Sequence, residues 1–254
     1  MRLLRCRDLE QFHAQAARLF RARIEANPQL VLAPPAGRTP KGMYRLLTEE
    51  ARARPLDCSG LTVFAIDEIV FLGPGGFRFR RDVEEDFLAW ARVPPERCRF
   101  FDADAADLET MCAAHEAAIR AAGGLDLVVM GLGENGHIAS NEPGSALDSR
   151  SRPVTLTRKT LAQFFPEAHP LPPKPWRAVT LGIATILEAR SIVVLAAGAH
   201  KRRAVQALLE APVSELFPCT ALRAHRDVTA IVDAAAYPSD LHPRVFRQKP
   251  SAGR

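Results

Sequence analysis

A histidine and a carboxylate five residues apart form a pair in this sequence that could move protons. His137 and Glu142 lie in the stretch LDLVVMGLGENGHIASNEP, residues 125–143, which begins apolar and then becomes rich in glycine. The apolar run predicts one buried strand, and glycines directly after a strand let the backbone turn sharply close to a ligand. We therefore expect a site for proton transfer at the carboxyl end of this strand.

A second pair of acidic residues follows another apolar run. Residues 61–66 predict a buried strand, and Asp67 and Glu68 come directly after it. Carboxylates at the carboxyl end of a strand are poorly placed for packing but well placed for chemistry, because ligands of parallel α/β sheets bind there. Both side chains are therefore candidate site residues.

A loop typical of anion binding precedes these carboxylates. The segment PPAGRTPKGMY follows a short strand expected at residues 29–33, and Gly37 and Thr39 stand where a helix is expected to begin, at about Pro40. Free backbone N–H groups and the helix dipole favour an anion at such a junction. An ordinary strand-to-helix turn is the alternative. The formal net charge of +5 suits a small anionic substrate.

The glycines Gly131, Gly133 and Gly136 also match the G-x-G-x-x-G pattern of dinucleotide sites. That fingerprint requires an acidic residue at the end of a second strand about 20 residues further on. The sequence that follows, SALDSRSRPVTL, contains no such strand end. A nicotinamide site is therefore disfavoured.

The central stretch resembles the signature of a known family. GLGENGHIASNEPGSALDSRSRPVTLT is similar to the motif of glucosamine-6-phosphate deaminases, and the resemblance extends over residues 5–236. The related 6-phosphogluconolactonases share G-x-G-x-D-G-H but continue with Leu-Phe-Pro, where this chain has Asn141, Glu142 and Pro143. The resemblance implies a reaction without metal or cofactor, in which glucosamine 6-phosphate and water give fructose 6-phosphate and ammonia.

The resemblance also implies the catalytic roles. Asp67 would be the base that moves a proton between C2 and C1 of the sugar, with Glu68 in support. His137 would protonate the ring oxygen and open the pyranose. Glu142 would orient His137 and set its charge, and Asn135 would modulate the pair, because it matches a family position that is either aspartate or asparagine.

The substrate-binding residues follow from the same resemblance. Lys201 matches the lysine of the family's G-x-x-K phosphate motif, and a lysine at the start of a helix opposes the helix dipole, which favours a functional role. The other expected contacts to the phosphorylated sugar are Gly37, Arg38, Thr39 and Gly136.

The chain departs from the deaminase pattern at the phosphate end. Gln163 stands where deaminases have an arginine that grips the phosphate, within a shortened, proline-rich segment, residues 161–176, expected to be a loop or lid. Arg38 replaces a glycine and could either add a phosphate contact or narrow the site. An isomerase, deaminase or lactonase for another sugar phosphate, or a non-catalytic sugar-phosphate sensor, therefore remain alternatives. Residues 76–77 are the nearest match to a Ser-Tyr pair of the family.

Allosteric members of the family use an arginine and a lysine just past the Asn-Glu-Pro motif to bind an activator. Arg152 matches the arginine, but Val154 takes the place of the lysine. This difference predicts an enzyme without that regulation.

Strands that alternate with amphipathic helices predict a three-layer α/β fold with a mostly parallel central sheet, and the resemblance makes it modified Rossmann-like. Strands are expected at 29–33, 61–66, 125–130, 153–156, 191–196 and 229–232, with a strand and turn at 177–187, and helices at 8–25, 105–122 and from about 40 and 198. We expect one domain at residues 1–237 and a flexible tail at 238–254. His115 is expected at a helix surface or boundary.

The composition indicates the cellular compartment and the kinds of partner that the protein has. The five cysteines are scattered without a C-x-x-C pair, which argues against a disulfide framework or zinc site and for a reducing compartment. The first residues carry no long apolar stretch, and charges of both signs are interspersed. We therefore expect a cytoplasmic monomer or small homo-oligomer that binds neither nucleic acid nor membrane.

Overall fold

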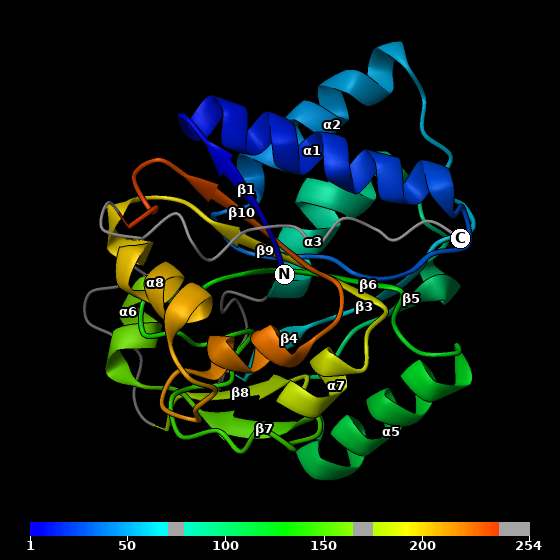
Figure 1. Cartoon of the computed structure of the whole chain (residues 1–254). Coiled ribbons are helices and arrows are strands. Elements are labelled where there is room, and N and C mark those ends of the chain that lie inside the picture. The colour runs from blue at the N-terminus through cyan, green and yellow to red at the C-terminus, as the bar shows by residue number, and fades with distance from the viewer. Residues whose placement is uncertain (71–78, 165–174, 239–254) are drawn as a thin grey trace, which may run out of the picture.

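The computed structural model describes residues 1–70, 79–164 and 175–238, and its strands form two sheets (Figure 1). The strands are β1 (Arg2–Cys6), β2 (Val31–Ala33), β3 (Thr62–Phe64), β4 (Asp67–Val70), β5 (Cys98–Arg99), β6 (Leu127–Gly131), β7 (Arg152–Thr155), β8 (Arg177–Thr180), β9 (Ser191–Ala196) and β10 (Val228–Asp233). The α-helices are α1 (Leu9–Ala26), α2 (Lys41–Ala53), α3 (Phe79–Val83), α4 (Ala89–Ala91), α5 (Leu108–Ala121), α6 (Arg158–Phe164), α7 (Ile183–Leu187) and α8 (Arg202–Glu210). A short turn of helix, η3 (Ala199–Lys201), precedes α8.

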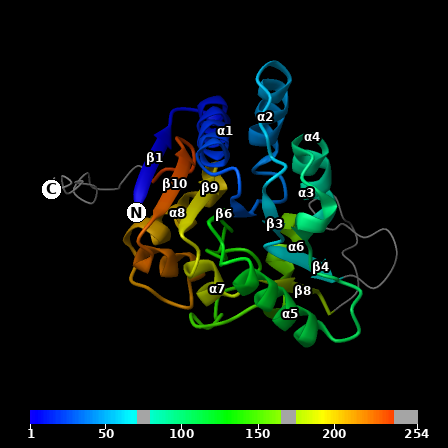
Figure 2. The same cartoon turned by 90° about the vertical axis from the view of Figure 1, so that its right-hand side faces the viewer.

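The central sheet has seven strands in the order β1-β10-β9-β6-β2-β3-β5, and every neighbouring pair is parallel. Parallel sheets must be covered on both faces. Along β6, Leu127 and Val129 pack in one cluster with residues of α1 and α2, whereas Val128 and Met130 pack in another with residues of α5, α7 and α8. Figures 1 and 2 show α1 and α2 on one side of the sheet and α5 and α7 on the other. The predicted three-layer α/β fold is confirmed.

The prediction of one strand at residues 61–66 that ends at Asp67 and Glu68 is wrong, because these two residues belong to a second, antiparallel sheet. The strand in the central sheet, β3, ends at Phe64, and Asp67 begins β4 in a three-stranded sheet of order β4-β8-β7. The chain leaves the central sheet because β4 pairs antiparallel with β8, where Asp67 lies opposite Thr180. Asp67 and Glu68 therefore lie at the junction of the two sheets. The predicted edge strand near residue 153 is confirmed as β7.

Two further elements differ from the sequence-based expectation. The edge strand β1 was not predicted, because Arg2 and Arg5 are exposed and leave little apolar pattern. Helix α6 includes residues 161–164, which were expected in a loop, and residues 165–174 of that segment lie outside the described residues. The single domain at 1–237 remains a prediction, and the expected tail lies outside the described residues from residue 239 onward.

Helix α1 begins where a capping residue allows it. The Asp8 side chain accepts a hydrogen bond from the backbone N–H of Gln11 at 2.7 Å, which satisfies a donor that the first turn leaves free. Phe12, Phe20 and Ile24 then turn to the sheet and are fully buried. Among the helices of the described residues, none is long and apolar enough to cross a bilayer.

Candidate active site at the carboxyl end of the central sheet

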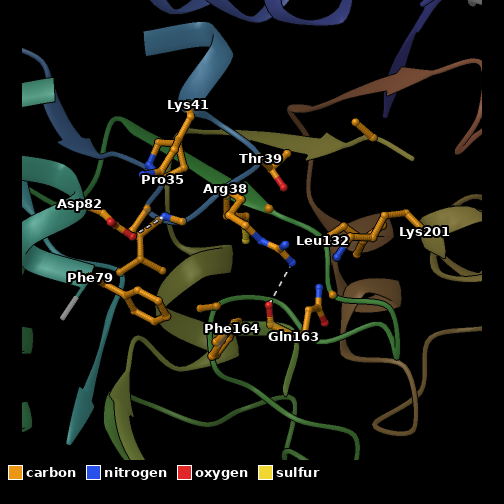
Figure 3. A pocket seen from close by; sticks show the side chains of 18 of the residues that line it. Pro35, Arg38, Thr39, Lys41, Phe79, Asp82, Leu132, Gln163, Phe164 and Lys201 are labelled. Atoms are coloured by element: carbon orange, nitrogen blue, oxygen red, sulfur yellow. Dashed lines mark hydrogen bonds between the residues drawn. The ribbon is translucent and has the colours of Figure 1, made fainter. Parts of the chain in front are cut away.

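A pocket of about 700 Å³ opens at the carboxyl end of the central sheet (Figure 3). Its walls come from the loops after β2, β6 and β9, from the junction between β3 and β4, and from the end of α6. The predicted site residues that line it are Gly37, Arg38, Thr39, Asp67, His137 and Lys201. Segments far apart in the sequence thus meet at one site, as expected for strand ends of a parallel sheet.

Asp67 carries the carboxylate best placed for proton transfer. Ser140 Oγ donates a hydrogen bond to Asp67 Oδ2 at 2.7 Å, and the backbone N–H of Ser140 is fixed by Thr180 Oγ1 at 3.1 Å. Burial raises the pKa of Asp67 to about 7, the Ser140 hydrogen bond lowers it, and the charge of Glu68 raises it. A carboxyl group that titrates near neutral pH matches the requirement for a general base.

Glu68 does not line this pocket. Its carboxylate accepts hydrogen bonds from the backbone N–H groups of Phe79 and Arg80, each at 2.8 Å, and the side chain is buried. Glu68 therefore fixes the first turn of α3 beside Asp67.

The imidazole of His137 lies over a glycine that makes room for it. A Cβ atom at Gly133 would lie 2.4 Å from the His137 ring, so no larger residue fits there. The ring is buried, and its Nδ1 lies 3.5 Å from Thr160 Oγ1. Burial lowers the pKa of His137 to about 4; Glu142 raises it and Lys201 lowers it further. The ring is therefore neutral at pH 7, with one N–H donor and one acceptor nitrogen.

Glu142 and Asn135 stand behind His137 rather than in the pocket wall. Asn135 donates to Glu142 Oε2 at 2.8 Å and accepts from the His137 backbone N–H at 3.2 Å. The other carboxylate oxygen accepts from the backbone N–H of Thr157 at 3.1 Å. Within residues 1–70, 79–164 and 175–238 no hydrogen bond joins Glu142 to the His137 ring, so Glu142 acts on the imidazole through its charge.

Gly136 serves the turn of this loop and does not line the pocket. Its φ of +87° is a conformation that side chains rarely adopt, and a Cβ there would lie 2.8 Å from the Phe217 ring. The glycine is required by backbone geometry and by close packing.

The loop after β2 has the expected shape but an unexpected partner. Gly37 has a φ of +83°, and the Tyr44 hydroxyl braces the loop by donating to Pro35 O at 2.8 Å. The Gly37 N–H, however, donates to Asp82 Oδ2 of α3 at 3.2 Å. A phosphate that takes this N–H must therefore displace the Asp82 carboxylate.

Lys201 brings a buried ammonium group to the pocket. The residue is only 4% exposed, and no anion partner for it lies in the described part of the chain. Burial lowers its pKa to about 8; Glu134 raises it, whereas Arg38 and Lys159 lower it. A buried, unpaired cation costs free energy, which marks this position as a candidate anion site.

Arg38 and Gln163, the two departures from the family pattern, lie in contact. Arg38 Nη2 donates to the backbone oxygen of Gln163 at 3.1 Å (Figure 3), and both residues line the pocket. The guanidinium therefore lies between the loop after β2 and the end of α6.

His115 was expected at a helix surface or boundary, and this prediction is wrong. The side chain is 6% exposed, its ring stacks on Phe101 with 3.9 Å between ring centres, and Nε2 lies 3.2 Å from Ala65 O. The ring fills the space between α5 and the central sheet, where burial lowers its pKa to about 4.

The sequence interpretation missed several site residues. Ser140 lies inside the central motif, three residues after His137, so its position could have suggested a role. Asp82 and Thr160 carry no spacing signal. Residues 76–77 lie outside the described residues. In the part of the chain that the structure describes, no three His, Cys, Asp or Glu side chains gather to hold a metal ion.

Fold and site together define a Rossmann-like α/β protein with a pocket at the carboxyl ends of its parallel strands. Within that class, a sequence profile described as glucosamine-6-phosphate isomerases/6-phosphogluconolactonase matches residues 8–231. The chain belongs to this family.

Comparison with individual proteins shows which members of the family the chain resembles. A glucosamine-6-phosphate deaminase of Arthrobacter sp. (strain FB24) is 36% identical over 250 residues, which cover 95% of each chain. A solved monomeric glucosamine-6-phosphate deaminase superposes with a TM-score of 0.86 at 34% identity and covers 93% of this chain and 98% of its own. The 6-phosphogluconolactonase of Trypanosoma cruzi reaches a TM-score of 0.73 at 20% identity over 92% of this chain and 95% of its own, which shows the shared fold alone.

Proposed function

We propose that this chain is a glucosamine-6-phosphate deaminase, which converts glucosamine 6-phosphate and water into fructose 6-phosphate and ammonia. The observation that carries the proposal is that the carboxylate of Asp67, the imidazole of His137 and the ammonium of Lys201 line one pocket. The name of the relatives that match nearly the whole chain supports the same reaction.

His137 opens the pyranose ring. Because its pKa lies at about 4, the imidazole is neutral at pH 7; it accepts the proton of the anomeric hydroxyl, becomes an imidazolium, and then gives a proton to the ring oxygen as the C1–O bond of the ring breaks. Glu142 stabilises the positive charge that develops on the ring during this exchange.

Asp67 then acts as the base on the open-chain sugar. Its carboxylate takes the proton from C2 and returns it to C1, which converts the aldose amine into a ketose imine. Water hydrolyses the imine, and the nitrogen leaves as ammonia. The pKa of about 7 for Asp67 lets its carboxylate act as the base near neutral pH, whereas the pKa of about 4 for His137 keeps the imidazole neutral at the same pH.

The phosphate of the substrate binds at the other side of the pocket. Lys201 supplies the buried positive charge, and Thr39 and Arg38 supply donors from the loop before α2. The phosphate competes with Asp82 for the Gly37 N–H.

A direct assay tests this proposal. Ammonia release from glucosamine 6-phosphate is measured beside hydrolysis of 6-phosphogluconolactone, with Asp67→Asn and His137→Gln as inactive controls. Ammonia release that both substitutions abolish is the expected result. Lactone hydrolysis without ammonia release would refute the proposal, as would binding of glucosamine 6-phosphate without turnover.

A related sugar phosphate is the second candidate substrate. The observation in its favour is the contact between Arg38 and Gln163, which gives the phosphate end a composition unlike that of the deaminase pattern. A higher kcat/KM on another amino-sugar or ketose phosphate than on glucosamine 6-phosphate would establish it.

We further infer that the protein works in the cytoplasm as a monomer or small homo-oligomer. The five free cysteines support a reducing compartment, and a solved relative is described as monomeric. Sedimentation of the purified chain measures its oligomeric state.

A further inference from the structure

The pocket wall contains an imidazole that the proposed mechanism does not use. His13 projects from α1, an element that carries none of the predicted site residues, yet it lines the same pocket as Lys201 and Thr39. Its side chain is half-buried. No hydrogen bond to either ring nitrogen is found among the described residues, although the residue lines a cavity.

The position of the ring depends on a glycine in the first turn of α2. A Cβ atom at Gly42 would lie 2.3 Å from Nδ1 and Cε1 of His13, a distance that no real contact allows. The bare backbone at residue 42 therefore lets the imidazole lie against the helix start. That turn directly follows the loop of Gly37 and Thr39, so His13 lies beside the expected phosphate position.

The charges around this corner favour an anion. Helix α2 begins without an acidic residue in its first turn and without a side-chain cap. The Lys41 N–H donates to Arg38 O at 3.3 Å, which leaves the N–H groups of Gly42 and Met43 available. Lys201 and His200 line the pocket from η3. Burial lowers the pKa of His13, Arg45 of α2 lowers it too, and Asp233 of β10 raises it. At pH 7 the ring is thus a neutral donor, which adds an N–H group without adding to the positive charge around Lys201.

We propose that His13 is a phosphate ligand of the substrate, donating a ring N–H to a phosphate oxygen opposite Lys201. This contact supplies part of the binding that Gln163, in place of an arginine, does not give. The identity of the sugar rests on the proposed function, whereas the contact requires only a ligand with a phosphate group.

Substitution of the ring separates a hydrogen bond from packing. His13→Leu keeps an apolar body but has no donor, and His13→Gln keeps a donor. We expect His13→Leu to raise KM for glucosamine 6-phosphate about tenfold, with kcat changed less than about twofold. His13→Gln should recover part of the loss. Arg18→Gln, an exposed change on the same helix outside the pocket, should leave both constants unchanged.

A glycine substitution tests the geometry independently. Gly42→Ala should raise KM because the methyl group displaces the ring. In a His13→Leu background the same change should raise KM little further, and the double-mutant cycle measures the coupling between the two residues. Because alanine favours a helix over glycine, this variant should fold. Equal effects of Gly42→Ala in both backgrounds would contradict the proposal.

Calorimetric titration with inorganic phosphate distinguishes this inference from the proposed function. We expect the affinity of the protein for phosphate to fall about tenfold in His13→Leu, whatever sugar the enzyme prefers. If the wild type releases no ammonia but His13→Leu still lowers the affinity for phosphate, the proposed reaction is refuted and the His13 contact is supported. Unchanged phosphate affinity in His13→Leu, or no phosphate binding by the wild type, would overturn the inference.

Discussion

The hydroxyl of Ser140 donates a hydrogen bond to the carboxylate of Asp67 at 2.7 Å, across 73 residues of sequence. It joins the loop of His137 to the first residue of β4, and thus fixes the candidate acid and base relative to each other. The hydrogen bond favours the ionised carboxylate, while burial favours the protonated one. The pKa of about 7 for Asp67 is the balance of these opposing effects.

Removal of this hydroxyl should shift the pH dependence of the reaction. Ser140→Ala removes a bond that lowers the pKa of Asp67, so the pKa rises and the acid limb of kcat/KM moves to higher pH. A lost hydrogen bond of about 1 kcal/mol corresponds to roughly 0.7 pH unit. The pH profiles of wild type, Ser140→Ala and the control Ser145→Ala provide the measurement. An acid limb that stays in place would remove Asp67 as the titrating group.

Asp67→Asn should abolish turnover while leaving substrate binding intact. General bases contribute about 10²–10⁴-fold, so a variant with more than about a tenth of the wild-type kcat would exclude Asp67 as the base. Single-turnover kinetics and titration with glucosamine 6-phosphate separate the two effects.

The same substitution should stabilise the fold at alkaline pH. The pKa of Asp67 is raised from 3.8 to about 7 in the folded protein, so the ionised side chain opposes folding, and stability falls as pH rises from about 4 to 7. Asparagine does not ionise and still accepts from Ser140. We expect Tm of the variant to exceed that of the wild type at pH 8 by about 2–4 °C, equal to about 1 kcal/mol, and by less at pH 5. An equal difference at both values would show that ionisation is not the cause.

The sequence predicted those parts of the site that are local. His137, Glu142 and Asn135 fall within one motif directly after a strand with a clear apolar run, and the strand was confirmed as β6. Asp67 was predicted as a candidate site residue and lines the pocket, although its strand was misassigned because the apolar run at residues 61–66 continues across the junction between β3 and β4.

Contacts between distant elements could not be predicted in this way. The bond between Ser140 and Asp67 depends on the pairing of β4 with β8. The bond from Gly37 to Asp82 depends on how α3 packs beside the loop after β2. His115 shows the same limit, since its helical spacing does not reveal the aromatic ring of Phe101 that covers it.

Substitution of Lys201 should weaken substrate binding without lowering the stability of the fold. Lys201→Met removes a charge-assisted bond to phosphate worth about 1.5–3 kcal/mol, so KM should rise roughly ten- to a hundredfold. Because the unpaired ammonium is buried, the same change should keep or raise Tm. Lys159→Met, which removes an exposed lysine paired with Glu134, serves as the control. A lower Tm with unchanged KM would make Lys201 a structural residue.

The kinetics should be hyperbolic and insensitive to N-acetylglucosamine 6-phosphate. Arg152, which matches the arginine of allosteric relatives, donates to Asn141 Oδ1 at 2.9 Å and to Arg150 O at 3.3 Å, so its guanidinium braces β7 against the central motif. Val154 replaces the lysine that would complete the activator site. Initial rates with and without the acetylated sugar give the test, and a sigmoidal curve that it straightens would refute the prediction.

Arg38 should compensate for the arginine that Gln163 replaces. A guanidinium has five donors in a planar fork and can bind phosphate in a bidentate manner, and the one donor already given to Gln163 O holds it at the edge of the pocket. Arg38→Gly, although it restores the usual deaminase sequence, should therefore lower kcat/KM on glucosamine 6-phosphate about tenfold, mainly through KM. Arg38→Lys keeps the charge but not the planar guanidinium, so its kcat/KM should lie between those of the wild type and Arg38→Gly. If Arg38 instead crowds the pocket, Arg38→Gly will raise kcat/KM, and such a rise would indicate that the natural substrate is a different sugar phosphate.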